Sequence, residues 1–351
     1  MNSYNFVSTQ ATRSTKSLLS YWALLPALAM GLGCGDAEQS SVEERALALS
    51  TPAVVASFDP AQGQLPESVT ADNDGNFYLS MSNTVQKLSP NGTLSLYAQF
   101  PTPAGNFAAG VKFGPNGYLY VASAGFDPSQ GAAGLYKVSP GRTVSLVTQL
   151  DPTGFPNDIA FDADDNALVT DPFLGRVYKV DRSGNSSVWI QDARLLGNPA
   201  NPALVIAPFG VDGIAFDKNK RNLYLGNLDS GSIYRVAVGS GCAPGPLQLW
   251  VTDPKLRGAD GIAFDKKGNL LVAVNAQDQI AQVAPNGSVS VVAAGAPLDS
   301  PSSVVFGQHG NDKKNLYISN FAIARALGVK PGAPAPSLTR IGVQFGGQEI
   351  P

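Results

Sequence analysis

A short motif that the chain repeats almost letter for letter is the feature that most limits its fold. The segment VDGIAFDKNKRNLYLGN begins at residue 211, and ADGIAFDKKGNLLVAVN begins at residue 259. Each copy has a polar residue, an apolar stretch that ends in Phe-Asp, a polar turn and a second apolar stretch. A unit of this kind is typical of folds built from repeated supersecondary structures.

Four weaker copies of the unit occur elsewhere in the chain. They begin near residues 66, 108, 156 and 301, so six copies recur at intervals of 42 to 55 residues. A third short apolar run, such as RVYKV or SIYRV, follows each copy. A fourth, such as SVWIQ, follows in all but the last. Four short strands in each of six units predict an all-β fold, the six-bladed β-propeller.

The sixth copy lacks its fourth strand, and one apolar strand is left over elsewhere. The unused segment AVVASF, at residues 53–58, precedes the first unit and can supply the missing strand. Pairing this segment with the last unit closes the ring and removes an open sheet edge. We therefore expect a propeller over residues 53–343, followed by a tail at residues 344–351.

The N-terminal residues are expected to serve export rather than the fold. Arg13 and Lys16 precede an apolar run of 16 residues, which is typical of a signal peptide over residues 1–33 and is short for a membrane span. The run ends in GLGCGD, which is similar to a bacterial lipobox. Cys34 would then be lipidated, and residues 34–52 would form a tether.

Two alternatives to lipidation stay open. The box has Gly31 where Leu is usual, so the protein could be cleaved and secreted without a lipid. Cys34 could also form a disulfide with Cys242, the only other cysteine. We expect an exported protein that is membrane-anchored in the bacterial envelope only through Cys34, or is secreted if that residue is not lipidated.

The net charge of −3 and the absence of a basic cluster exclude nucleic acid as an expected partner. We also expect the protein to be a monomer.

One position near the start of each unit carries residues that can bind a metal. Aligning the units on their turns places six residues at the same point, which we call the top ring: Glu67, Ala109, Asn157, Asp212, Asp260 and Ser302. The first strand of a propeller blade lines the central channel, so these side chains are expected to meet at one end of it, the top. Three carboxylates would repel one another there without a cation.

Calcium is the cation that suits this set of side chains. Ca²⁺ accepts several oxygen ligands and takes Asp, Glu and Asn together. Zinc is disfavoured, because the only histidine, His309, and Cys242 are expected in turns at the other end of the channel. The sequence therefore predicts a calcium site. Its ligands would be Glu67, Asn157, Asp212 and Asp260. The alternative is that these polar residues only cap the ends of inner strands.

At these residues the chain resembles the senescence marker protein, gluconolactonase and luciferin-regenerating family, which are calcium-dependent six-bladed propeller hydrolases. The resemblance covers roughly residues 53–343 and is most specific in LPES with Glu67, FPNDIAFD with Asn157 and GADGIAFD with Asp260. It implies that the same four residues hold a catalytic Ca²⁺ and that Asp260 acts as base or nucleophile. The family usually has Asn where this chain has Asp212.

The resemblance also implies the chemistry. Bound Ca²⁺ would polarise the carbonyl oxygen of a lactone or ester and stabilise the charge that develops on it. In addition to the catalytic ion, the protein could bind a second calcium ion with a structural role. More distantly, the chain is similar to the phosphotriesterase and paraoxonase propellers, but a single histidine excludes a paraoxonase-like histidine pair.

Loops that join the second and third strands of the units are also expected at the top. They supply candidate substrate contacts, each of which is alternatively a simple turn residue: Asp127, Asp171, Phe173, Asn227 and Asn275. Two longer segments, 192–209 and the loop after Asn320, could act as walls or a lid.

The sequence thus predicts an exported calcium-dependent hydrolase of lactones or related esters. Two alternatives remain. The propeller could be a non-catalytic binding module of the NHL-like type at the cell surface, since one fold hosts many functions. The calcium could also be purely structural.

Overall fold

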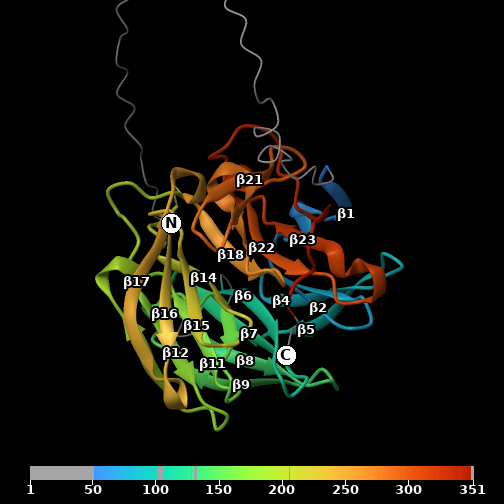
Figure 1. Cartoon of the computed structure of the whole chain (residues 1–351). Coiled ribbons are helices and arrows are strands. Elements are labelled where there is room, and N and C mark those ends of the chain that lie inside the picture. The colour runs from blue at the N-terminus through green and yellow to red at the C-terminus, as the bar shows by residue number, and fades with distance from the viewer. Residues whose placement is uncertain (1–50, 102–105, 128, 130–132, 205, 349–351) are drawn as a thin grey trace, which may run out of the picture. The chain divides into compact units, whose positions relative to one another are not determined.

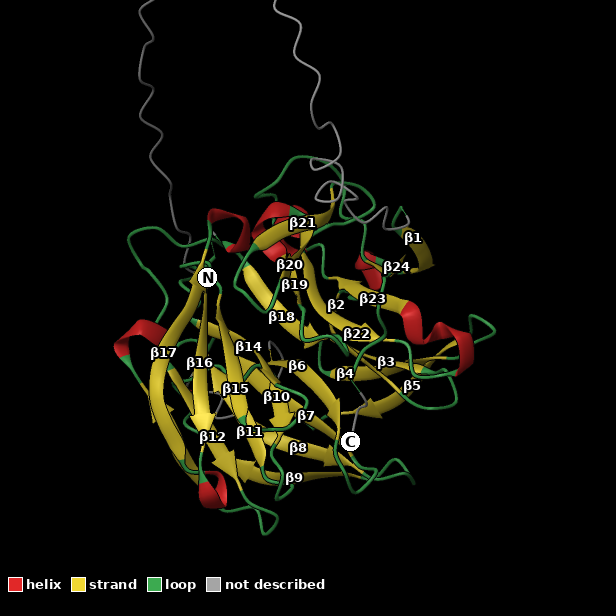
Figure 2. Ribbon diagram, in the orientation of Figure 1, coloured by secondary structure: helices red, strands yellow, loops and turns green. Residues whose placement is uncertain are grey.

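Six four-stranded antiparallel sheets make up the described part of the chain (Figures 1 and 2). The computed structural model describes residues 51–101, 106–127, 129, 133–204 and 206–348. The expected signal peptide, Cys34 and most of the expected tether lie outside these residues. No helix in the described ranges is both long and apolar enough to cross a membrane.

Each sheet is one blade, and in blades one to five the strands follow the order of the sequence from the inside outwards. Blades one to three comprise β2 (Pro66–Ala71), β3 (Phe77–Met81), β4 (Thr84–Leu88) and β5 (Leu94–Gln99); β6 (Asn106–Phe113), β7 (Leu119–Gly125), β8 (Gly134–Val138) and β9 (Val144–Gln149); and β10 (Ile159–Phe161), β11 (Ala167–Asp171), β12 (Arg176–Val180) and β13 (Ser186–Gln191). Blades four and five comprise β14 (Val211–Phe216), β15 (Asn222–Asn227), β16 (Ser232–Val238) and β17 (Pro244–Thr252); and β18 (Ala259–Phe264), β19 (Leu270–Val274), β20 (Gln279–Val283) and β21 (Val289–Ala294).

The sixth blade confirms the predicted closure of the ring. It contains β22 (Pro301–Phe306), β23 (Asn315–Asn320) and β24 (Ser337–Gly342), and its outer strand is β1 (Ala53–Ser57). Ala53 pairs with Arg340 and Ser57 with Ser337, so the two ends of the propeller share one sheet. The six-bladed all-β fold expected from the repeats is therefore confirmed.

Within the residues that the structure describes, helical structure is confined to short connections. The α-helix there, α1 (Ile323–Ala326), follows β23. The described 3₁₀ turns are η1 (Pro60–Gln62), η3 (Ala193–Leu195), η4 (Ser240–Cys242), η5 (Pro254–Leu256), η6 (Asn275–Gln277) and η7 (Gly310–Lys314). Cys242 is buried in η4, between β16 and β17, and forms no disulfide within the described residues.

The second Asp of the repeated motif shapes the turn between the first two strands of a blade. The Asp162 carboxylate accepts hydrogen bonds from the backbone N–H groups of Asp164 and Asn166, each at 2.8 Å, and from Asn166 Nδ2 at 2.7 Å. Asp72, Asp217 and Asp265 hold their turns in the same way. The prediction that these aspartates are turn residues is confirmed.

The core lies between adjacent blades rather than inside one. In one cluster, Leu168 and Val177 of blade three pack with Ile214 and Leu225 of blade four, and all four are buried. Consecutive inner strands are also in contact all the way round, from β2 through β6, β10, β14, β18 and β22 back to β2. This contact fixes the six inner strands around one channel.

Candidate functional site

The top-ring residues stand at irregular points of the inner strands. Glu67, Asp212 and Asp260 are the second residues of β2, β14 and β18, and Asn157 precedes β10 by two residues. In β2, β6, β14, β18 and β22 the pairing register shifts at the top-ring position. A β-bulge bends the strand and re-aims a side chain. These bulges therefore mark the top ring as a special part of each strand.

Glycines beside the top-ring positions allow the backbone of one inner strand to pack closely against that of the next blade. The backbone N–H of Gly110 donates to the carbonyl oxygen of Asn157 at 2.9 Å. A Cβ atom added at Gly213 would overlap the carbonyl oxygen of Asp260, and one at Gly261 would lie 2.7 Å from that of Ser302. The Ser302 hydroxyl in turn donates to the carbonyl oxygen of Glu67. Each contact joins one top-ring position, or the glycine after it, to the top ring of the next blade.

Substituting Gly213 by Ala should therefore destabilise the protein by about 3 kcal/mol, because backbone atoms of two packed strands would have to move apart. The matched control is Gly226→Ala in the adjacent strand β15, where an added Cβ would meet nothing closer than 3.6 Å. The control should change stability by less than about 1 kcal/mol. Chemical denaturation of both variants measures the difference, and equal losses would contradict this close packing.

The three top-ring carboxylates are shielded from water and repel one another. Asp212 is only 2% exposed, and burial raises its pKa well above the ordinary value, with a further rise from the neighbouring Asp260. Burial also raises the pKa of Glu67, followed by repulsion from Asp212. The pKa of Asp260 rises through burial and then through Glu67. The three groups therefore act on each other electrostatically across the channel.

Asn275 orients one of these carboxylates. Its Nδ2 donates to Asp260 Oδ2 at 3.0 Å, and this bond partly offsets the rise in the pKa of Asp260. The Oδ1 atom of Asn275 is buried and has no hydrogen-bond partner among the described residues. The structure thus places Asn275, expected from the sequence as a substrate contact, beside Asp260 of the top ring.

Asp158 is a further channel carboxylate that the sequence did not assign to the site. Its Oδ1 accepts from the backbone N–H of Ile159 at 2.8 Å, and its Oδ2 accepts from that of Ile214 at 3.2 Å. Burial raises the pKa of Asp158, whereas nearby Lys112 lowers it. The only sequence signal was its place beside Asn157 in FPNDIAFD, and strand alternation alone would send the two side chains to opposite faces.

Some oxygens of this site fit a hard cation. Buried Glu67 Oε2 and Asp212 Oδ1 lack hydrogen-bond partners among the described residues, as does Asn275 Oδ1. Uncompensated buried oxygens are costly, and carboxylate and amide oxygens are the ligand types that Ca²⁺ prefers. Within the described ranges, however, no three Asp, Glu, His or Cys residues stand together closely enough to hold an ion. The donor set therefore suits Ca²⁺ in its chemistry, with the carboxylates apart.

The candidate substrate contacts divide into two kinds. Asp171 is completely buried, and its Oδ1 accepts from the backbone N–H groups of Phe155, Phe173 and Leu174. Asn227 uses both ends of its amide, donating to the carbonyl of Leu196 at 3.0 Å and accepting from the N–H of Ser230 at 3.0 Å. These bonds favour a structural role for Asp171 and Asn227.

Phe173 belongs instead to an aromatic cluster with Phe126, Phe155 and Phe209. Ring centroids of neighbouring members lie 5.0 to 6.1 Å apart. Phe126 is 49% exposed, whereas Phe155 and Phe209 are buried. The cluster therefore presents an apolar surface formed by the loops of blades two to four. Asp127, beside Phe126, accepts from the N–H and hydroxyl of Ser129.

The two long loops are each anchored by an aspartate. Asp229 accepts backbone hydrogen bonds from Asn198, Ala203 and Phe209 at 2.6 to 3.0 Å, which fixes segment 192–209. Asp299 pairs with Arg325 of α1 and accepts from the N–H of Ala335 at 2.9 Å, which fixes the loop after Asn320. The two segments also line one small cavity of about 40 Å³ together. They therefore lie against each other.

His309 lies away from these residues. It is exposed, precedes η7 and contacts the carbonyl oxygen of Asn73 through Nδ1 at 2.9 Å. Asn73 belongs to the turn after β2, so His309 stands at the turn end of the blades, opposite the top ring.

The fold and the site together define a six-bladed propeller with interacting carboxylates at the starts of its inner strands. Comparison with protein families identifies the family to which the chain belongs. The chain matches the SMP-30/Gluconolactonase/LRE-like region over residues 68–237 and 210–322, and it belongs to that family. No curated protein matches the chain by sequence.

Solved structures share the fold at low sequence identity. Regucalcin from Agrobacterium tumefaciens, a calcium-binding protein, is 15% identical with a TM-score of 0.60, over 81% of this chain and 91% of its own. A gluconolactonase from Xanthomonas campestris is 14% identical with a TM-score of 0.54, over 84% and 95%. A catalytically inactive virginiamycin B lyase from Staphylococcus aureus, with quinupristin, is 13% identical with a TM-score of 0.55, over 81% and 83%.

Proposed function

We propose that this protein is a calcium-dependent hydrolase of lactones or related esters. The observation that carries the proposal is the set of buried, mutually repelling carboxylates with unpartnered oxygens at the top ring, in a chain of the gluconolactonase-like family. The residues that would hold Ca²⁺ are Glu67, Asn157, Asp212 and Asp260. When bound, the ion would polarise the substrate carbonyl and stabilise the negative charge that develops on its oxygen.

Asp260 is our candidate for the catalytic base. It is buried, and Asn275 holds its Oδ2 in one orientation. In the proposed step, Asp260 accepts a proton from water as the water oxygen bonds to the lactone carbonyl carbon. The ring C–O bond then breaks, and the proton passes to the leaving oxygen to give a hydroxy acid. The alternative, direct attack by the carboxylate on the carbonyl, would use the same oriented group.

The aromatic cluster around Phe173 supports a substrate with an apolar part. Phe126 exposes half of its surface beside Phe155 and Phe173, so a partly hydrophobic acid or alcohol portion could bury area there. Segment 192–209 and the loop after Asn320 would form the walls.

The rival functions have less support. Family membership does not favour a non-catalytic NHL-like module. The inactive virginiamycin B lyase carries a histidine-to-alanine change, whereas the single histidine of this chain lies at the turn end of the blades. A purely structural calcium remains the alternative that activity measurements must separate.

The first test is a calorimetric Ca²⁺ titration of the metal-stripped protein and of a Glu67→Gln, Asp260→Asn double variant. The parent should bind Ca²⁺, and the variant should bind at least about a hundredfold more weakly, since two charged oxygen ligands are lost. Hydrolysis of a panel of lactones and esters can be measured as acid release in a pH-stat. Only the calcium-loaded parent should be active. A folded parent that does not bind Ca²⁺ would refute the metal assignment. Binding without turnover of any substrate would favour structural calcium.

We also propose that residues 1–33 direct export and that Cys34 is lipidated, as the charged start, apolar run and GLGCGD motif suggest. Mass spectrometry of protein from the native envelope should find a mature chain that begins at a diacylglyceryl-modified Cys34. An unmodified chain that still begins at Met1 would exclude both processing steps.

A further inference from the structure

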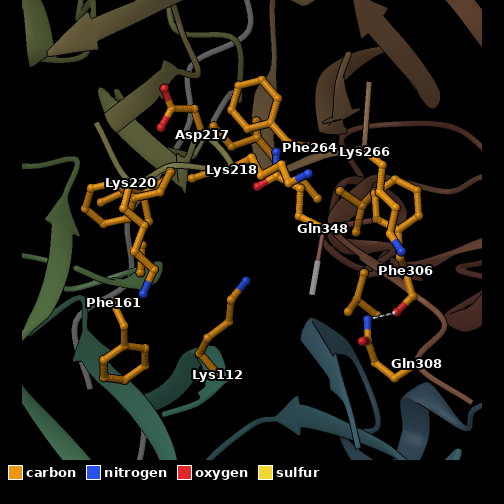
Figure 3. Close-up of a pocket in the computed structure, with 18 residues that line it drawn as sticks. Lys112, Phe161, Asp217, Lys218, Lys220, Phe264, Lys266, Phe306, Gln308 and Gln348 are labelled. Carbon is orange, nitrogen blue, oxygen red and sulfur yellow. Dashed lines mark hydrogen bonds between the residues drawn. The ribbon is translucent and has the colours of Figure 1, made fainter. Parts of the chain in front are cut away.

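A second cavity, separate from the top ring, occupies the channel at the other end of the inner strands. It has a volume of about 550 Å³, and Figure 3 shows the side chains that line it. Inner strand β6 contributes Lys112, and β10, β14, β18 and β22 contribute their last residues, such as Phe161, Phe216, Phe264 and Phe306. We call this space the lower cavity. Cavities of roughly this size, about 300 to 1,000 Å³, accommodate small organic ligands.

Most of the wall of the lower cavity is apolar. The contributing apolar residues come from four successive blades: Ala160 and Phe161, Ile214 to Phe216, Ile262 to Phe264, and Val304 to Phe306. Gln348 also lines the cavity, and its backbone N–H donates to the carbonyl oxygen of Phe264 at 3.2 Å. Such a wall can bury the apolar body of a ligand.

The charges of the lower cavity are mainly positive. Lys112, Lys218, Lys220 and Lys266 line it, and Figure 3 shows the amino groups of Lys112 and Lys220 extending into the hollow. None of the four forms a salt bridge with a carboxylate in the described ranges. Lys220 Nζ instead donates to the backbone carbonyl of Asp162 at 2.9 Å.

Two carboxylates of the described residues interact with this region. Asp217 lines the cavity, but its oxygens accept hydrogen bonds from the N–H groups of Arg221 and Asn222 and from Asn222 Nδ2. Asp158 lies close enough to Lys112 to interact with it electrostatically, but it also accepts two backbone hydrogen bonds. The lower cavity therefore has an excess of positive charge next to apolar walls.

We propose that the lower cavity is a second binding site, specific for a small amphiphilic anion, such as a carboxylate with an aliphatic or aromatic body. The anionic head would lie beside the amino groups of Lys112 and Lys220 (Figure 3), and Lys218 and Lys266 would add to the positive potential of the cavity. The apolar body would lie against the phenylalanine and aliphatic walls. A neutral ligand lacks the first interaction, and inorganic phosphate lacks the second. The site is independent of the proposed hydrolase activity, because it shares no side chain with the proposed calcium ligands.

The test uses anilinonaphthalene sulfonate, a fluorescent anion with an aromatic body, and the purified full-length chain. The parent should bind it with a saturable fluorescence increase. Octanoate should displace it, whereas octanol, with the same chain and no charge, should not. A Lys112→Met, Lys220→Met variant keeps the apolar stems and loses both charges. It should bind the probe about tenfold more weakly, the usual effect of losing charged hydrogen bonds.

Two further variants keep the result interpretable. Lys137→Met in β8, whose ammonium lies over the Tyr118 ring away from the cavity, is the matched control and should bind like the parent. Lys218→Met with Lys266→Met removes two exposed charges and should weaken binding even if the first variant does not fold. Equal displacement by octanoate and octanol, or unchanged affinity in the folded lysine variants, would overturn the proposal.

Discussion

Replacing Asp260 with asparagine should reduce lactone hydrolysis about a thousandfold, which is the range expected when a positioned general base is lost. The change keeps the shape of the side chain and retains an oxygen at its end. It removes the proton acceptor and one negative charge from a group that Asn275 holds in place. Steady-state kinetics at saturating Ca²⁺ measure the effect, because saturation separates lost catalysis from weakened metal binding.

The matched control for this variant is Asp253→Asn. Asp253 stands near the same end of blade five, but its carboxylate caps η5 by accepting from the N–H of Lys255 at 2.8 Å. The control should keep activity within about twofold, since Asn can also cap a helical turn and Asp253 is not one of the proposed calcium ligands. An Asp260→Asn variant with near-parental kcat would show that the base is another group and would redirect attention to Asp158.

Replacing Asp212 with asparagine should stabilise the metal-free protein at neutral pH, by about 2 kcal/mol. Burial and repulsion from Asp260 raise the pKa of Asp212 in the folded state. A carboxyl whose pKa is raised by folding contributes stability below its unfolded pKa and loses that contribution as pH rises through the folded value. Parent and variant should therefore differ little at about pH 4 and increasingly towards about pH 7.5.

Calcium should reverse this order. The parent supplies one more charged ligand than Asp212→Asn, so saturating Ca²⁺ should raise the melting temperature of the parent more than that of the variant. Thermal unfolding across the pH range, with chelator and with Ca²⁺, measures both effects in one series. A metal-free parent more stable than the variant at neutral pH would contradict the repulsion within the top ring.

The propeller could be predicted because its determinants are local and repeated. The aspartate that bonds its own turn, as Asp162 does, appears at the same place in several units, and the missing fourth strand of the last unit points to residues 53–58. The first and last residues of the strands were harder to predict from the sequence. β10 begins only at Ile159, because the backbone N–H of Asp158 donates to the Thr170 hydroxyl and Asn157 stays outside the regular ladder.

The top ring could be aligned from the sequence, but its surroundings could not. Counting back from the turns located Glu67, Asp212 and Asp260 on three inner strands. The bulges at those positions, and the use of Asn275 to orient Asp260, depend on how neighbouring strands meet. The lower cavity was missed for a similar reason. Lys112 and Lys220 are far apart in sequence, so only the closed ring brings them together.

The pairing of β1 with β24 also sets the order in which the molecule can be completed during synthesis. The ribosome makes Ala53 near the start of the propeller, yet its partner Arg340 is among the last propeller residues to emerge. Until then blade six lacks its third strand, β1 has no partner strand, and the apolar contacts that Leu338 and Ile341 make in two of the core clusters are missing. Contacts between such distant parts of a chain form slowly, because a long loop must close first. Nascent chains that stop short of β24 should therefore depend on chaperones to remain soluble.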